Sequence, residues 1–132
     1  MSVQMELHQI IISDMQDSQI IVLREVDGDR KFPIVIGSTE AHAIDRRLKG
    51  IVPPRPQTHD LLAKVIEVLG GELVRIEITR LEEHTFYASL HIRRVATGDV
   101  VEVDSRPSDA IALGIASGVP IFVSEQVLAA VG

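Results

Sequence analysis

Ionisable residues gather at two Arg-Pro segments of the 132-residue sequence, and an apolar, helix-like run follows each segment. The residues are Arg55, His59 and Asp60 in the first segment and Asp104, Arg106 and Asp109 in the second. Carboxylates supply oxygen ligands for divalent cations, arginine forks bind phosphate, and an imidazole moves a proton near neutral pH. If the two segments face each other in the fold, they combine the parts of a metal-assisted phosphodiester hydrolase.

This chemistry predicts a site made from several chain segments. The catalytic candidates are Glu40, His59, Asp60, Asp104 and Asp109; the candidate ligands for Mg²⁺ or Mn²⁺ are Asp60, Asp104 and Asp109; the candidate substrate-binding residues are Arg55, Arg106 and Ser108. Glu40, Asp60 and Asp109 each stand in the first turn of a predicted helix, where the helix dipole favours negative charge. We expect the four carboxylates to converge on one open cleft, with His59 or an arginine beside them.

The same residues also have a purely structural interpretation. Thr58 and Ser108 stand where helix N-caps belong, and an acid in the first turn stabilises a helix by about 0.3–1 kcal/mol. The second hypothesis is therefore a non-enzymatic binding or regulatory module that recognises a small anion or a protein partner. A net charge of -6 and an aromatic content of 3% favour it, because acidic surfaces repel nucleic acid and few rings can stack on bases.

Other chemistry-bearing patterns are missing from the sequence. It has no Gly-rich phosphate loop, no HExxH zinc motif and no GxSxG nucleophile motif, and its five histidines lack zinc-site spacing. The absence of cysteine excludes disulfides and thiolate metal ligands. The best concentration of positive charge for binding phosphate is Arg46, Arg47, Lys49 and Arg55, which also fits a solvated helix end followed by a loop.

The elements that must position these residues follow from periodicity. Alternating or continuous apolar residues predict strands over 3–12, 19–26, 31–36, 74–79, 86–93, 100–104 and 120–123. The Asp27-Gly28-Asp29 segment predicts a hairpin turn, and Glu82-Glu83-His84 joins two of the strands. A stiff connector with three prolines covers residues 50–56.

Helices are predicted between these strands. They cover 39–49, about 58–69 and 109–117, with a short C-terminal helix; the predicted N-caps are Ser38, Thr58, Ser108 and Ser124. The expected core faces are Ala41, Ile44 and Leu48 in the first helix, and Leu61, Leu62, Val65, Ile66 and Leu69 in the second, where Asp60 and Lys64 should pair. The third helix carries small residues that permit close approach, namely Ala110, Ala112, Gly114 and Ala116.

Strands that come in runs separated by helices indicate the α+β class. We expect a single domain with a mainly antiparallel mixed sheet of about six or seven strands, and three to four helices packed mostly on one face. The hydrophobic content of 45% and the small residues of the third helix predict a homodimer. The N-terminus lacks a signal-peptide pattern and no apolar run reaches membrane-spanning length, so we expect a cytoplasmic protein without a membrane partner.

Three ordered motifs, FPIVIGSTEA at 32–41, PRPQTHDL at 54–61 and VDSRPSDAIAL at 103–113, are followed by Pro120-Ile121. Together they resemble the bifunctional nuclease domain, formerly a domain of unknown function, over nearly all of residues 1–132. The resemblance implies nuclease activity on RNA and DNA, with single-stranded nucleic acid as an expected partner. The positions that it carries over by motif are Glu40, His59, Asp60, Asp104, Arg106 and Asp109.

Overall fold

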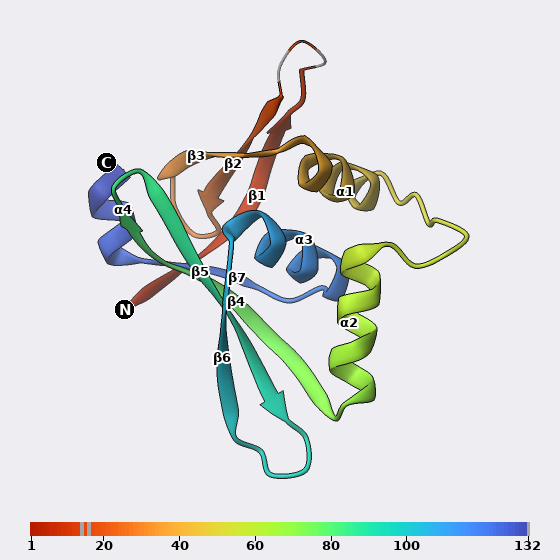
Figure 1. Cartoon of the computed structure of the whole chain (residues 1–132). Helices are drawn as coiled ribbons and strands as arrows, with labels where there is room; N and C mark the ends of the chain where they lie inside the picture. The colour runs from red at the N-terminus through yellow and green to blue at the C-terminus, as the bar shows by residue number, and fades with distance from the viewer. Residues whose placement is uncertain (14, 16, 132) are drawn as a thin grey trace.

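The computed structural model (Figure 1) describes residues 1–13, 15 and 17–131. The elements are β1 (Ser2–Ile11), β2 (Ser18–Glu25), β3 (Lys31–Gly37), α1 (Ser38–Leu48), α2 (Thr58–Val68), β4 (Gly71–Glu82), β5 (Thr85–Arg94), β6 (Val100–Ser105), α3 (Pro107–Ser117), β7 (Ile121–Ser124) and α4 (Glu125–Val131). No helix of the described residues is long and apolar enough to cross a membrane.

The seven strands of the described chain form one sheet in the order β3-β2-β1-β7-β4-β5-β6. Only the β4–β7 pairing is parallel, and every other neighbouring pair among the described residues is antiparallel. Helices α1, α3 and α2 lie side by side in that order, and α4 packs apart from them against β4 and β7 (Figure 1). The predicted α+β fold with a mainly antiparallel mixed sheet is therefore confirmed.

The core lies between the sheet and the helices, and α3 contributes more buried residues to it than α1 or α4. In β3, Phe32, Ile34 and Ile36 are buried while Pro33 and Val35 are exposed, as expected when one face of a strand is covered. The corresponding faces of β4 and β5 meet in register and bury Ile76, Ile78, Ala88 and Leu90. Full burial of each large aliphatic side chain stabilises the fold by about 1.5–3 kcal/mol.

Helix α3 lies in the centre of the fold. The prediction of a homodimer through its small residues is therefore corrected. Its small residues Ala110, Ala112 and Gly114 are buried in the core instead of forming a free surface. A Cβ atom added at Gly114 would lie 3.4 Å from Ile76 Cγ1, so the small residue lets α3 approach β4 closely. The small residues therefore serve packing within one chain.

Helix α2 exposes most of the residues that were predicted to face the core. Leu61, Leu62, Val65 and Leu69 are all exposed, with Leu61 at 56% and Leu69 at 80%, while Ile66 packs against the core. Helix α2 packs mainly against α3 and β4, so one narrow side of it is covered. Apolar spacing marks a helix face but does not say whether the fold supplies a partner for it. Leu48 of α1 is exposed for the same reason.

Three of the four predicted N-caps are wrong by one or two residues. The caps of α1, α2 and α3 are Gly37, Gln57 and Arg106, so Ser38 and Thr58 are the first helical residues and Ser108 is the second. Proline suits the first helical position because its missing N–H would have no partner there, which starts α3 at Pro107. The fourth cap is confirmed, because Ser124 Oγ accepts the Val127 N–H at 3.3 Å.

Candidate functional site

The two Arg-Pro segments meet in the structure. The His59 Nε2 atom in the first turn of α2 lies 3.0 Å from Asp109 Oδ1 in the first turn of α3, although 50 positions separate them in the sequence. The His59 side chain is only 14% exposed. The two segments therefore face each other in the fold.

Asp109 connects His59 to an arginine. Its second oxygen, Oδ2, accepts a hydrogen bond from Arg106 Nε at 2.9 Å and lies 2.8 Å from Arg106 Nη2 in an ion pair. Arg106 Nη2 also lies 3.8 Å from Glu40 Oε1 at the start of α1. The hydrogen bond and charge of Asp109, and then the charge of Glu40, raise the pKa of Arg106 above its usual range. We call His59, Asp109, Arg106 and Glu40 the ionic chain.

The two ends of the ionic chain, His59 and Glu40, are mostly covered, whereas Arg106 inside the chain is open to solvent. Glu40 is 15% exposed, whereas Arg106 is 67% exposed. A guanidinium has five N–H donors, so Arg106 keeps donors free for an anion after binding Asp109. His59 is held at its Nε2 atom by a carboxylate, and a proton on Nε2 leaves Nδ1 able to accept one. The ionic chain thus combines a proton acceptor with an exposed phosphate-binding group.

The remaining predicted carboxylates lie outside the ionic chain. Asp60 Oδ2 accepts the Gln57 backbone N–H at 3.1 Å in a capping box. Asp104 is opposite Ser89 in the β5–β6 register, on the side of β5 that faces away from Ala88 and Leu90 and therefore from the core. The expected convergence of four carboxylates is not observed. Among the described residues, no group of three or more His, Asp or Glu could hold a metal ion.

The substrate-binding candidates also separate. Arg106 belongs to the ionic chain, and Ser108 is 6% exposed at the second position of α3. Arg55 is exposed in the connector, and its side chain makes no hydrogen bond or ion pair with the described residues. The predicted pair between Asp60 and Lys64 is not formed. Instead, Lys64 Nζ lies 3.8 Å from Glu67 Oε1, one turn further along α2.

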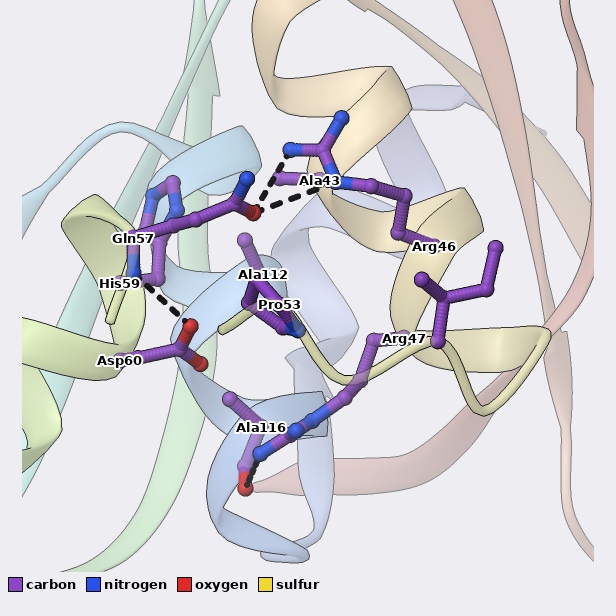
Figure 2. A pocket seen from close by; sticks show the side chains of 10 residues that line it. Ala43, Arg46, Arg47, Pro53, Gln57, His59, Asp60, Ala112 and Ala116 are labelled. Carbon is purple, nitrogen blue, oxygen red and sulfur yellow. Dashed lines mark hydrogen bonds between the residues drawn. The ribbon is translucent and has the colours of Figure 1, made fainter. Parts of the chain in front are cut away.

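A small pocket lies beside His59, between α1, the proline-rich connector and α2 (Figure 2). Its volume is about 30 Å³, enough for one or two water molecules. Figure 2 shows the Arg46 guanidinium reaching from α1 to the Gln57 amide, with distances of 2.9 Å and 3.2 Å to Gln57 Oε1. Arg47 donates to the Ala116 carbonyl oxygen at 2.8 Å on the other side of the pocket.

The sequence prediction missed part of this pocket. Arg46 and Arg47 belonged to the predicted concentration of positive charge but were not assigned to the site. Gln57 was not considered, although its position three residues before Asp60 is the spacing of a capping box. Lys49 forms an ion pair with Asp45 at 2.9 Å, so the four predicted cations do not act as one patch.

Similar proteins place the chain in a family. Residues 21–132 match the family described as the Bifunctional nuclease domain. An uncharacterised protein of Mycobacterium tuberculosis (strain ATCC 25618 / H37Rv) is 44% identical over 123 residues, which cover 93% of this chain and 72% of that protein.

Plant relatives carry the nuclease name. Bifunctional nuclease 1 of Oryza sativa subsp. indica is 26% identical over 118 residues, and Bifunctional nuclease 2 of Arabidopsis thaliana is 24% identical over 119 residues. These matches cover 88% and 89% of this chain but only 36% and 33% of the plant proteins. The match to the family extends over most of the sequence and contains all four residues of the ionic chain. The chain therefore belongs to the bifunctional nuclease domain family.

Proposed function

We propose that the chain is a nuclease that hydrolyses phosphodiester bonds of RNA or DNA, with the ionic chain as its reactive centre. The observation that carries this proposal is the 3.0 Å contact between His59 Nε2 and Asp109 Oδ1. The other oxygen of Asp109 binds the exposed Arg106. Membership of the bifunctional nuclease domain family supports it, as do the names of the plant relatives.

In this proposal each residue has a separate role. His59, oriented by Asp109, takes a proton from the attacking water, which the small pocket has room to hold. The water oxygen bonds to phosphorus as the bond from phosphorus to the leaving sugar oxygen breaks, and the leaving oxygen takes a proton from solvent. A positioned general base contributes about 10²–10⁴-fold to a rate. Arg106 binds the phosphate with its free donors, and Glu40 holds Arg106 from the other side.

The carboxylates do not fit a two-metal arrangement as they are placed. Glu40 and Asp109 both hold Arg106, so a cation between them would take the position of the guanidinium. Asp60 is held in a capping box, and Asp104 lies on the other face of the sheet. A role for Mg²⁺ or Mn²⁺ remains a proposal that requires Arg106 to move, and we assign no catalytic step to a metal.

A non-enzymatic binding module is the second candidate, favoured by one observation. Asp109 is held by an ion pair with Arg106 and Asp60 by a capping box, so both carboxylates have structural partners. In that case Arg106 would bind a small anion or an acidic group of a protein partner without cleaving anything.

Cleavage of labelled RNA and single-stranded DNA by highly purified protein tests the proposal, with Mg²⁺, with Mn²⁺ and with chelator. His59→Ala should lower the rate about 10²–10⁴-fold. His8→Ala, at an exposed histidine of β1, is the matched control and should cleave like the parent protein. Equal cleavage by parent and His59→Ala protein would indicate a contaminating nuclease or another site. Absence of cleavage in every condition would favour the binding module.

We also propose that the chain forms a homodimer through α2. At about 100° per residue, Leu61, Leu62, Val65, Val68 and Leu69 form one apolar stripe, centred on Val65. All five residues are exposed. Two antiparallel copies related by a two-fold axis at Val65 would place Leu61 against Leu69 and Leu62 against Val68 of the second copy. Such a self-complementary surface is what a two-fold interface requires.

A further inference from the structure

A larger groove lies on another side of Arg106. The start of β2, the end of β3, the β4–β5 turn and the start of α3 form its walls, and Ser18, Gly37, His84, Phe86, Arg106 and Ser108 are among the lining residues. Its volume is about 420 Å³, compared with about 30 Å³ for the pocket beside His59. Arg106 lines this groove and also binds Asp109, so the groove adjoins the ionic chain.

These volumes decide where a substrate can lie. Small-molecule sites usually measure about 300–1,000 Å³, so the groove can hold a nucleotide and the pocket beside His59 cannot. We propose that the groove binds one nucleotide unit of a nucleic acid, with its base against the apolar wall and its phosphate on Arg106. This inference rests on the proposed nuclease function and assigns its substrate-binding groove.

The groove walls suit a base as well as a phosphate. The Phe86 ring lies 5.8 Å from the buried Phe32 ring, measured between centroids, which fixes the apolar wall. Strand β3 is an edge strand, so its outer backbone N–H and C=O groups are not paired with another strand of the described chain. Such groups can form hydrogen bonds with the edge of a base. Arg106 provides the positive charge for phosphate.

His84 is the least expected residue of the groove. Glu83 and His84 form the two-residue turn between Glu82 and Thr85, with φ of 50° and 66°. Asparagine and glycine are preferred at such positions, and each left-handed residue other than glycine costs on the order of 1 kcal/mol. The His84 side chain makes no hydrogen bond or ion pair with the described residues. Its ring therefore has N–H and N atoms available for a ligand in the groove.

An NMR titration of the isotope-labelled protein tests this inference, with 5′-adenosine monophosphate, adenosine and inorganic phosphate as separate probes. The monophosphate should shift the amide signals of Gly37, Thr85 and Phe86 and bind about tenfold more tightly than either fragment. His84→Asn keeps a side chain that tolerates the left-handed backbone and should weaken this binding about tenfold. His8→Asn, away from the groove, should bind like the parent protein.

The outcomes separate the groove from the nuclease activity. Monophosphate binding in the groove without cleavage of RNA or DNA keeps the groove proposal and removes the nuclease. Cleavage that depends on His59, combined with unchanged monophosphate binding in His84→Asn, removes the groove and keeps the nuclease. Equal affinity for phosphate and for the monophosphate would identify an anion site at Arg106 alone and overturn nucleotide recognition.

Discussion

At the scale of single residues, Asp109 has two partners of different kinds. One oxygen orients the His59 ring and the other holds the Arg106 guanidinium, so a change at Asp109 disturbs both the base and the phosphate-binding group. A substitution of Arg106 removes the phosphate-binding group but leaves the contact between Asp109 and His59 in place. The two proposed roles can therefore be measured separately.

Arg106→Gln should raise KM for an oligonucleotide about tenfold or more, because a charge-assisted contact with phosphate is lost. Arg106→Lys should recover only part of this loss, since lysine keeps the charge but not the planar fork. Arg24→Gln, on an exposed pair with Glu6, is the control. Steady-state kinetics at fixed salt measure the effect, and an unchanged KM in Arg106→Gln would remove Arg106 from substrate binding.

The sequence predicts a catalytic role for Asp60, whereas the structure gives Asp60 a role in capping α2. As the acid of a capping box, it should contribute about 0.5–2 kcal/mol to folding stability. Asp60→Ala should lower the free energy of unfolding by about 1 kcal/mol in urea denaturation, while the cleavage rate per folded molecule falls far less than in His59→Ala. A loss of activity as large as that of His59→Ala, at unchanged stability, would restore Asp60 as a catalytic residue.

At the scale of elements, sequence periodicity predicted the strands and helices well because their apolar patterns are local. It did not predict which helix faces are covered, since Leu61, Val65 and Leu69 have the same spacing whether or not a partner is present. The N-caps failed for a different reason. Serine and threonine also occur just inside helices. Helix α2 begins after the capping box of Gln57 and Asp60, and α3 begins at Pro107, which suits the first helical position.

The β4–β5 turn should have a strained backbone, and this turn places His84 in the groove. Replacing Glu83-His84 by Asn-Gly should raise the free energy of unfolding by about 1–2 kcal/mol, because both positions have positive φ. The same replacement should weaken binding of the monophosphate. The turn at Thr97-Gly98 already has glycine at its positive-φ position and serves as the internal comparison. Unchanged or lower stability in urea denaturation would show that the turn is not strained.

At the scale of the whole molecule, the topology explains what the sequence could and could not predict about the site. The Arg-Pro motifs identified His59, Arg106 and Asp109, and the fold brings these three residues together. Asp104 was grouped with them because it is close in sequence. Its strand position turns it to the other face of the sheet, which required the register between β5 and β6 to be known.

The exposed stripe of α2 predicts an oligomer. Light scattering at micromolar concentration should show a dimer of the parent protein, and Val65→Glu should be monomeric, because a charge at the two-fold axis would be buried beside its own copy. Lys64→Glu, on the charged side of the same helix, should remain dimeric. A monomeric parent protein, or a dimeric Val65→Glu variant, would contradict an interface centred on Val65.

The central claim is that His59 and Asp109 act as one catalytic pair, and a double-mutant cycle under single-turnover conditions tests it most directly. His59→Ala, Asp109→Asn and the double variant are compared for the rate of oligonucleotide cleavage. Residues that act as a unit are strongly non-additive, so the double variant should be no slower than the worse single variant. Losses that multiply in the double variant, or full activity in either single variant, would contradict the claim.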